Sequence, residues 1–425
     1  MARVQGSHQG VDRFGDLSSG DPEQFTVLTW RFVVDGPDRY VADVELRGRR
    51  VAQVGFVPLP FPKGCASGCE PFWGFTRFDL IERSAARGPG DLMCGRLPGA
   101  GRVFRSMDVQ AYQHGIYPRS EDVVAATRGR ERGRNSQDDV ERAFASDRQD
   151  FLRAQQEAGL DYFSDGLLRW QDIFRPFVEI CHGMDAHTLV RWFDTNSFFR
   201  APEVTGELAL SSPVPKQMED DRDIPDPKMA TLPSPYLFSR AAQTDEDDRN
   251  AQMRDLTREI LRPVAQELSR RGYRLLHLQE PWLVYFGTDR ADWDDFEKAV
   301  GEIREATEGA TLVLNTYFGD AGPYADRLRR LPVDAVGIDF VETDVDELGT
   351  KWEVGLLAGV LDGRRSPVEP VKPTVEFARR AAETVGASSL FVSSNSGLEL
   401  LPRDIAQQKV LRLGEISAQL KDRLR

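Results

Sequence analysis

Short hydrophobic runs alternate with amphipathic stretches from about residue 109 to the end of the chain. The runs start near 109, 160, 229, 274, 311, 335, 354 and 389, and each precedes a crossover segment. Hydrophobic residues with helical spacing, such as Val140, Phe144 and Phe151, predict a helix in the first crossover. Ser136 suits its N-cap and Gly159 its C-terminal end. Strands that alternate with helices pair in parallel, so eight units predict an α/β fold, a closed (β/α)8 TIM-type barrel.

An open doubly wound sheet is the alternative to the barrel. That fold needs a glycine-rich phosphate loop after its first strand, and HGIYPRS is not such a loop. Two further features are expected within the barrel. HTLVRWFD and EVTGELALSS predict an inserted antiparallel pair, and helices are expected at about 170–180, 245–271, 293–308, 324–331, 373–386 and 402–425.

The residues before the barrel have a different character. FTVLTWRFVV and RYVADVELRGRRVAQVGFVPL are rich in β-formers and carry turn dipeptides. The stretch that follows is rich in Gly, Pro and Cys. The sequence therefore predicts a polar, disordered tail (1–24), a small β-rich module (25–106) as an N-terminal extension, and the barrel (107–425).

Composition and charge narrow the partners. The 425 residues are 40% hydrophobic and 29% charged, with a net charge of -13, and the pI is about 5.1. An acidic surface disfavours nucleic acid and anionic membranes, and no apolar stretch is long enough to span a bilayer. The N-terminus does not resemble a signal peptide, and four cysteines are too few for a disulfide scaffold. A cytoplasmic protein that binds a small molecule is expected, and a homo-oligomer is left open.

Polar residues follow the predicted strands, at the end where barrels of this type place their chemistry. Glu280 lies between an apolar strand and a proline, which predicts a site residue rather than a turn residue. Turn dipeptides give Asp165 and Asp362 a structural alternative. The positions selected by this rule are His114, Asp165, Glu280, Asn315, Tyr317, Asp339, Asp362 and Ser396.

Several segments resemble the barrels of cobalamin-independent methionine synthase. They are YPRSEDVV, QEAGLDYFSDGLLRWQD, WFDTNSFFRAPEV, LPSPYLFSR, LHLQEPWLV, LNTYFGD, LPVDAVGIDFVE, VLDGRRSPVE and SNSGLELLPRDIAQQK, in family order. Ser234 stands where glycine is usual, and Gln279 stands at the aspartate of the motif ending in Asp-Glu-Pro. The resemblance covers about residues 109–425, and TYF and WFDTN are closest to the family's N-terminal, zinc-free barrel.

The resemblance implies a catalytic zinc, but the residues at its ligand positions do not suit that metal. The family's His-x-Cys, Glu and Cys correspond here to Asn315, Tyr317, Asp339 and Ser396. Zinc prefers imidazole and thiolate ligands. Zinc is therefore not expected at this site, and activation of a zinc-bound thiol is not expected either.

Other residues have both a functional and a structural interpretation. Arg119 and Arg169 are candidates for binding a substrate carboxylate, with surface salt bridges as the alternative. Trp192, Phe193, Phe198 and Phe199 suit a platform for a pterin-like ring, and core packing is the competing interpretation. Cys65, Cys69 and Cys94 are either a metal site of unusual spacing or ordinary thiols.

Together these features favour a transferase that resembles methyltransferases and does not depend on zinc. It would transfer a methyl or other small group to an amino-acid-like acceptor, with a folate-type methyl donor. Glu280, Tyr317, Asp339 and His114 are the predicted catalytic residues, and the predicted substrate-binding residues are Arg119, Asp165, Arg169, Asn315 and Ser396. The alternatives are a non-catalytic folate- or substrate-binding barrel, and a lyase or decarboxylase that uses the same pocket for acid–base chemistry.

Overall fold

The computed structural model describes residues 28–34, 40–46, 49–56, 107–243 and 249–424. The chain divides into two compact units, Met1–Ala100 and Gly101–Arg425. In the first, three strands form an antiparallel sheet in the order β1-β2-β3: β1 (Leu28–Val34), β2 (Tyr40–Leu46) and β3 (Arg49–Phe56). The predicted tail, residues 57–106 and Cys65, Cys69 and Cys94 lie outside the described residues. The predicted domain boundaries stay a prediction.

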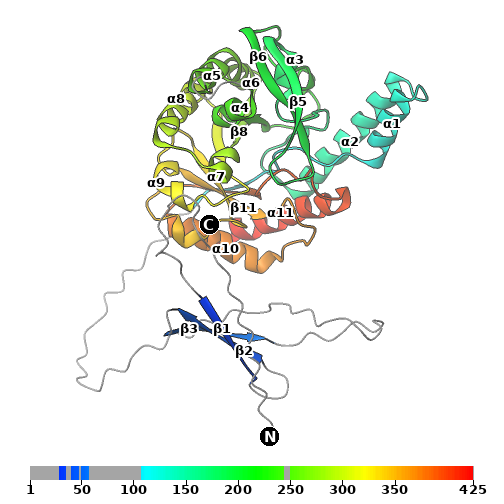
Figure 1. Cartoon of the computed structure of the whole chain (residues 1–425). Helices are drawn as coiled ribbons and strands as arrows, with labels where there is room; N and C mark the ends of the chain where they lie inside the picture. Colours follow the sequence, from blue (N-terminus) through cyan, green and yellow to red (C-terminus); the bar gives the residue numbers. More distant parts are fainter. Residues whose placement is uncertain (1–27, 35–39, 47–48, 57–106, 244–248, 425) are drawn as a thin grey trace, which may run out of the picture. The chain divides into compact units, whose positions relative to one another are not determined.

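The second unit is built on one curled parallel sheet of seven strands (Figure 1). Its order is β4-β12-β11-β10-β9-β8-β7, so each neighbour is reached by a crossover. These strands begin close to seven of the eight predicted starts. They are β4 (Val109–Ala111), β7 (Lys228–Pro233), β8 (Tyr273–Gln279), β9 (Thr311–Asn315), β10 (Ala335–Asp339), β11 (Gly355–Leu361) and β12 (Leu390–Ser394).

The strand predicted from residue 160 is not formed. Phe163 makes an isolated parallel bridge to Lys228, and the N–H of Asp161 donates to the carbonyl of Ala111 at 2.8 Å. The N–H of Ala111, however, donates to the Asp161 carboxylate at 2.7 Å. The Asp161 carboxylate thus accepts the hydrogen bond that, in a regular parallel sheet, the N–H of Ala111 would donate to a backbone carbonyl. The segment lies between the sheet's edge strands, β4 and β7, without becoming a strand.

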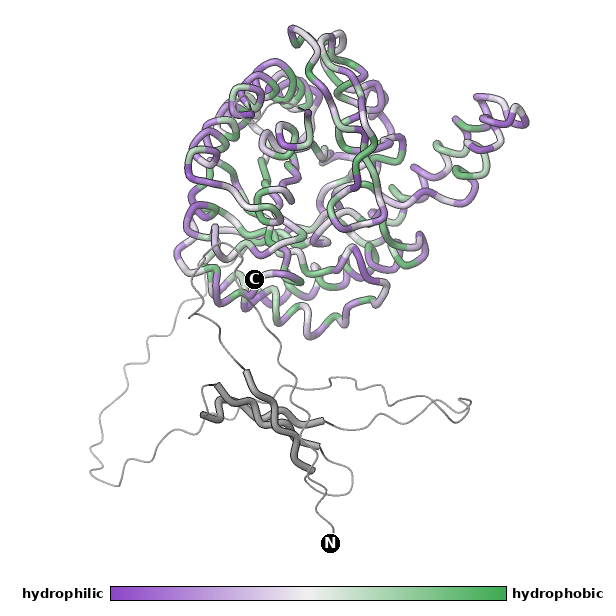
Figure 2. Tube along the Cα trace, in the orientation of Figure 1, coloured by the Kyte–Doolittle hydropathy of each residue, from purple (hydrophilic) through white to green (hydrophobic). Residues whose placement is uncertain are grey.

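The longer helices lie around the curled sheet, with many hydrophilic residues along them, whereas the helix Pro235–Ala241 is buried throughout (Figures 1 and 2). Eleven α-helices belong to the described part of this unit. They are α1 (Glu121–Glu131), α2 (Gln137–Ala158), α3 (Arg175–Glu179), α4 (Pro235–Ala241), α5 (Arg249–Leu256), α6 (Arg262–Arg270), α7 (Trp282–Phe286), α8 (Arg290–Ala306), α9 (Ala325–Leu328), α10 (Val371–Val385) and α11 (Arg403–Leu424). Among the described residues, no helix is both long and apolar enough to cross a membrane.

Several helices differ from the sequence-based expectation. The helix predicted at 170–180 is only the five residues of α3, and α9 is also shorter than predicted. The helix predicted at 245–271 is interrupted by a π-helical turn at Thr257–Leu261, between α5 and α6. Pro263 follows this turn, and proline cannot donate the backbone hydrogen bond of a regular helix. The Ser136 N-cap and the left-handed Gly159 at the end of α2 are confirmed.

The inserted antiparallel pair is confirmed and is longer than predicted. It consists of β5 (Cys181–Arg191) and β6 (Phe198–Leu210). Its tip, residues 192–197, is closed by a hydrogen bond from the N–H of Trp192 to the carbonyl of Ser197 at 2.9 Å. The Thr195 hydroxyl donates to the Trp192 carbonyl at 2.6 Å. These bonds give the tip a defined shape.

Helix α11 packs on α2 through Gly414, which predicts that this position tolerates no side chain. A Cβ at Gly414 would lie 2.0 Å from the carbonyl oxygen of Ala158, a backbone atom that cannot swing away. Gly414→Ala should therefore lower the free energy of unfolding by roughly 2 kcal/mol or more, as overpacking does. Gly301 in α8 is the matched control, because its Cβ would meet only Pro332 Cγ, at 3.9 Å. Gly301→Ala should be neutral or stabilising by up to about 1 kcal/mol. Chemical denaturation of both variants tests this, and equal stabilities would contradict it.

Candidate active site

The carboxyl ends of the parallel strands carry a layer of buried polar side chains. Asn315 ends β9 and Asp339 ends β10, while Asn395 follows β12. All three side chains are almost completely buried. The Asn395 amide donates to Asp339 Oδ1 at 2.9 Å, and the Asn315 amide donates to the Asn395 carbonyl at 2.9 Å. Strand ends far apart in the sequence are thereby joined.

Two glycines make room for these side chains. A Cβ at Gly337 would lie 2.1 Å from Asn315 Oδ1, and one at Gly359 would lie 2.8 Å from the Cα of Asn395. Burial raises the pKa of Asp339, against hydrogen bonds from Asn395 and from the N–H groups of Phe318 and Val341. Both Asp339 oxygens are therefore engaged within the protein.

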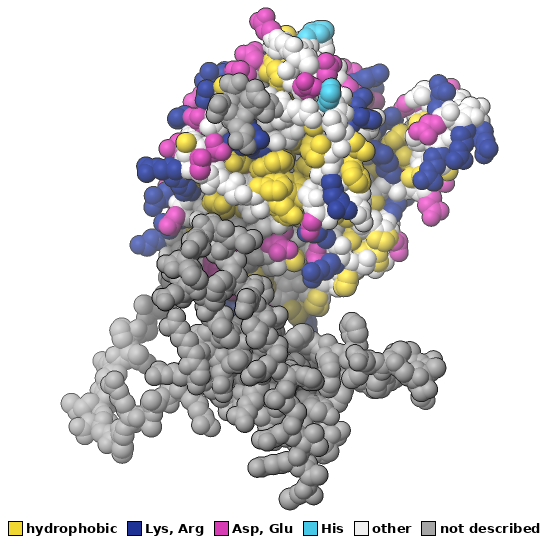
Figure 3. All heavy atoms as spheres, viewed as in Figure 1, with side chains coloured by type: hydrophobic (Ala, Val, Ile, Leu, Met, Phe, Trp, Pro, Cys, Tyr) yellow, Lys and Arg dark blue, Asp and Glu magenta, His cyan; other side chains and the backbone are white. Residues whose placement is uncertain are grey.

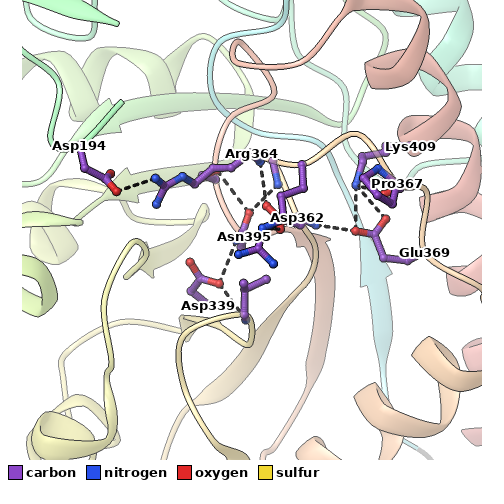
Figure 4. Close-up of polar contacts among 12 residues, drawn as sticks. Asp194, Asp339, Asp362, Arg364, Pro367, Glu369, Asn395 and Lys409 are labelled. Atoms are coloured by element: carbon purple, nitrogen blue, oxygen red, sulfur yellow. Dashed lines mark hydrogen bonds and ion pairs between the residues drawn. The ribbon is translucent and has the colours of Figure 1, made fainter. Parts of the chain in front are cut away.

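The polar layer continues into the loop after β11 (Figure 4). Asn395 Oδ1 accepts from the N–H of Gly363 at 2.9 Å, and the N–H of Asp362 donates to Glu369 at 2.8 Å. Glu369 also accepts from the fully buried Lys409, at 2.8 and 3.0 Å. The predicted turn role of Asp362 agrees with the N–H of Arg364 donating to it at 2.8 Å. This network holds the loop in place.

Glu280 is fully buried and bonds the beginnings of two helices. Its Oε2 accepts from the Ser234 hydroxyl and from the N–H of Leu237 in α4, at 3.0 Å for the latter. Its Oε1 accepts from the N–H of Leu283 in α7 at 2.8 Å. Burial raises the pKa of Glu280 to about 7, although these hydrogen bonds favour the ionised form. Both oxygens of this predicted catalytic residue are occupied by the protein itself.

Tyr317 and Gln279 connect this region with neighbouring strands. The Tyr317 hydroxyl donates to Gln279 Oε1 at 3.3 Å, and both side chains are buried. Burial raises the pKa of Tyr317, and the charges of Glu399 and Glu280 add to this effect. Two carboxyl groups therefore lie close enough to Tyr317 to influence its ionisation.

His114 lies in a buried stack rather than against solvent. Its ring is 3.9 Å from that of His277, centroid to centroid, at an interplanar angle of 18°. His114 Nε2 is 3.0 Å from the Ser394 carbonyl, and the Tyr112 hydroxyl is 3.1 Å from His277 Nδ1. Burial lowers the pKa of His114 to about 4. Both imidazoles are therefore neutral near pH 7.

The predicted substrate-binding residues are dispersed. Arg119 donates to the carbonyls of Leu168 and Trp170 at 2.7 and 2.6 Å, and Arg169 pairs with Glu141 at 2.6 Å. Asp165 accepts from the N–H of Leu167 at 3.0 Å, as in a turn. Ser396 donates within its own loop, to Asn395 Oδ1 and the Gly397 carbonyl, each at 3.3 Å. Ser396 and Asn315 both bond to Asn395, but none of the hydrogen bonds described above for Arg119, Arg169 and Asp165 reaches that cluster.

A cleft of about 350 Å³ opens at the carboxyl end of the sheet. Loops after β4 and after the 160–164 segment form one side, and the hairpin tip and the beginning of β6 form another. Gln279 and Glu399 come from strand ends. Glu280, Tyr317 and Asp339 are not among its lining residues, which are Ile116, Tyr117, Pro118, Arg119, Val124, Trp170, Gln171, Asp172, Ile173, Trp192, Ser197, Phe198, Phe199, Gln279 and Glu399.

Glu399 is the cleft residue that sequence reasoning missed. It lies in the loop between β12 and α11, and its Oε2 is buried without a hydrogen-bond partner among the described residues. Burial raises the pKa of Glu399 to about 7. Asp172, the other carboxylate in the cleft, accepts backbone N–H groups at both oxygens. Glu399 lies in one of the family-like motifs, and its place after a strand was the only available signal.

The hairpin tip is attached to the opposite side of the sheet. Asp194 pairs with Arg364, from the loop after β11, at 2.7 Å (Figure 4). Phe193 packs within 6 Å, centroid to centroid, of five rings that include Tyr285 (5.0 Å) and Phe318 (5.7 Å). Hydrophobic side chains gather on this face below the hairpin (Figure 3). Trp192 and Phe199 are buried in the core, as the packing interpretation expects, and they also line the cleft. The platform for a pterin-like ring stays a prediction.

Comparisons with known proteins agree with the motifs. Residues 179–383 match the model of the cobalamin-independent synthase N-terminal domain. A methionine synthase of Sulfolobus acidocaldarius is 26% identical over 70% of this chain and 88% of its own length. A 5-methyltetrahydropteroyltriglutamate–homocysteine methyltransferase of Nitratidesulfovibrio vulgaris is 28% identical over 52% of this chain but only 31% of its own length.

Solved structures show the same fold. A B12-independent methionine synthase from Shewanella sp. W3-18-1, in complex with selenomethionine, superposes with a TM-score of 0.58 at 17% identity. The match covers 75% of this chain and 99% of that one. A putative vitamin-B12-independent methionine synthase from Listeria monocytogenes gives 0.56 at 15% identity, over 74% of this chain and 99% of its own. The chain is therefore similar to the cobalamin-independent methionine synthases, and residues 179–383 match the N-terminal domain of that family.

Proposed function

We propose that the cleft is the active site of a transferase that moves a methyl or other small group to an amino-acid-like acceptor. One observation carries the proposal: Glu399 lines the cleft, its Oε2 has no hydrogen-bond partner among the described residues, and burial raises its pKa to about 7. Such a group can take a proton near neutral pH. The names of the relatives support methyl transfer as the reaction class.

In the proposed reaction, Glu399 accepts a proton from the ammonium group of the acceptor. The freed lone pair on nitrogen forms the bond to the methyl carbon. The donor nitrogen is protonated before transfer, so the bond between that carbon and the donor breaks with its electron pair on a nitrogen that leaves as a neutral amine. A folate-type donor, implied by the resemblance, fits this balance. The aromatic side chains in the cleft would exclude water from the reacting groups.

We propose that this transfer uses no zinc at the family's position. The donors there are an amide, a phenol, a carboxylate and a hydroxyl, none of them the imidazole or thiolate that zinc prefers. Asp339 is fully engaged, as described above, and Asn315 donates to a backbone carbonyl. Among the described residues, no three His, Cys, Asp or Glu side chains form a group that could hold a metal.

We also propose that the sheet functions as a closed (β/α)8 barrel. The segment at 160–164 bonds to β4 through Asp161 and to β7 through Phe163, which supports closure by an irregular eighth segment. We further propose a cytoplasmic location, because four cysteines in 425 residues are too few for a disulfide scaffold.

A binding-only barrel and a lyase remain the competing functions. A binding-only barrel is favoured if the ligand binds and no turnover is detected. A lyase or decarboxylase would use the same Glu399 but would cleave its substrate without a methyl acceptor. The open cleft favours a ligand site over a barrel mouth filled by side chains.

Glu399→Gln keeps the shape of the side chain and removes the base. Methyl transfer from a labelled folate donor, measured over candidate amine acceptors, should fall by roughly 10²-fold or more. In the wild type, kcat/KM should rise with pH through about 7, because the ionised form of Glu399 accepts the proton. The variant should lose this rise. Burial also raises the pKa of Glu280 to about 7, so the rise is assigned to Glu399 only if Glu280→Gln retains it.

The matched control for Glu399 is Glu353→Gln, a carboxylate whose side chain is 69% exposed. It should keep full activity. If Glu399→Gln turned over as fast as the wild type with the same pH profile, the proposed role would be wrong.

Glu280→Gln tests the helix-bonding role of Glu280. A glutamine has one acceptor oxygen, so its NH2 group would face either Leu283 or the Ser234–Leu237 pair. The variant should lose about 1–3 kcal/mol of unfolding free energy. Because the folded-state pKa of about 7 exceeds the ordinary value of 4.5, Glu280 stabilises most at low pH and loses that contribution as pH rises through 7. Urea unfolding should show a weaker decline between pH 5 and 8 in the variant.

Activity of Glu280→Gln separates positioning from catalysis. When the folded fraction is matched, kcat should change far less than in Glu399→Gln. A loss as large as that of Glu399→Gln in fully folded protein would restore Glu280 as a catalytic residue.

Elemental analysis of protein purified without chelator tests the zinc proposal. Well under one zinc per chain is expected, because the donor set is hard and internally bonded. Stoichiometric zinc that disappears on Asp339→Ala or Asn315→Ala would contradict it. Zinc lost only on Cys65→Ser or Cys69→Ser would belong to the N-terminal residues instead.

A further inference from the structure

Two residues that line the cleft each carry a buried polar atom without a hydrogen-bond partner among the described residues, and the two atoms have opposite hydrogen-bonding character. Glu399 Oε2 is an acceptor, and Trp170 Nε1 is a donor on a side chain that is 1% exposed. Buried polar groups without partners are costly in the free protein. Two of them in one cleft indicate a ligand that supplies a donor or positive charge to Glu399 and an acceptor oxygen to Trp170.

The other walls favour a cation over a neutral donor. Trp170, Trp192, Phe198 and Phe199 line the same cleft as Glu399. Aromatic faces attract organic cations, most strongly where water is excluded. Arg119 also lines the cleft, but its Nε and Nη2 donate to backbone carbonyls. A carboxylate together with aromatic walls is the chemistry that recognises alkylammonium groups.

The supply of acceptors indicates how many N–H groups the cation carries. A primary ammonium has three donors and needs three acceptors. Gln279 Oε1 already accepts from Tyr317, and both oxygens of Asp172 accept from backbone N–H groups. Glu399 Oε2 is the carboxylate oxygen of the described lining that lacks a partner. Tyr117, Gln171 and Ser197 also line the cleft, but their side-chain oxygens are neutral. A single charged acceptor amid aromatic carbon suits an ammonium in which methyl groups replace most N–H groups.

We propose that the cleft binds an N-methylated ammonium, tertiary or quaternary, that carries a hydroxyl or carboxylate oxygen for Trp170. This inference rests on the proposed function, since a methylated ammonium is the form an amine acceptor takes after receiving a methyl group. The cation lies on Glu399 with its methyl groups against the aromatic walls, and the oxygen accepts from Trp170 Nε1.

Calorimetric titration of the full chain with a graded series of small probes tests the assignment. Choline and dimethylethanolamine should bind at least about tenfold more tightly than ethanolamine, and than 3,3-dimethyl-1-butanol, the neutral isostere of choline. Tetramethylammonium, which lacks the oxygen, should bind more weakly than choline. Equal binding of choline and its neutral isostere would contradict the proposal that the ligand is a cation. Tighter binding of ethanolamine than of choline would contradict the proposal that its nitrogen is methylated.

Two cleft variants and one control test which side chain contacts the cationic group of the probe and which contacts its oxygen. Glu399→Gln should abolish the preference for choline over the neutral isostere. Trp170→Phe should weaken choline and leave tetramethylammonium unchanged. Glu353→Gln, on an exposed carboxylate, should change nothing. Choline binding that persists in Glu399→Gln would overturn the proposal.

The binding series is independent of turnover, so the two proposals can fail separately. Selective binding of methylated ammonium without methyl transfer would support this inference and count against the transferase. Methyl transfer to an acceptor of another class, with no selectivity in the probe series, would overturn this inference and leave the transferase standing.

Discussion

Buried polar side chains at the strand ends must form hydrogen bonds inside the protein, and this constraint determines the structure at the carboxyl end of the sheet. Asp339, Asn315 and Asn395 are shielded from water, so each donates to or accepts from another strand end or loop. The bonds are possible only because Gly337 and Gly359 leave space for them. The result is a rigid platform made from strands that are distant in the sequence.

The platform in turn positions loops. Asn395 holds the N–H of Gly363, and Glu369 with the buried Lys409 anchors the same loop from its other end. That loop presents Arg364, which pairs with Asp194 at the hairpin tip. The tip supplies Trp192 and is continuous with β6, which supplies Phe199 to the cleft. A polar network below the cleft therefore helps to define its aromatic wall.

The carboxyl groups illustrate how environment separates similar residues. Burial raises the pKa of Glu280 and Glu399 alike, to about 7. Both oxygens of Glu280 accept hydrogen bonds from backbone N–H groups in the first turns of α4 and α7, where N–H groups lack helical partners. Glu399 keeps an oxygen without a partner beside the cleft. The Glu280 carboxylate thus stabilises the fold, whereas the Glu399 carboxylate is available to a ligand.

The sequence by itself determined the repeat of strand and crossover, the starts of seven strands, the hairpin and the caps of α2, because these depend on local periodicity and side-chain type. It also showed the resemblance to cobalamin-independent methionine synthases, through short motifs in a fixed order. Only the tertiary structure decided that Asp161 would occupy a ladder donor and leave the 160–164 segment irregular. Only tertiary structure separated Glu280 from Glu399, because a carboxylate becomes available or occupied according to which backbone N–H groups other segments bring to it. The number of hydrogen bonds that each buried oxygen accepts is a property of packing, and no local pattern encodes it.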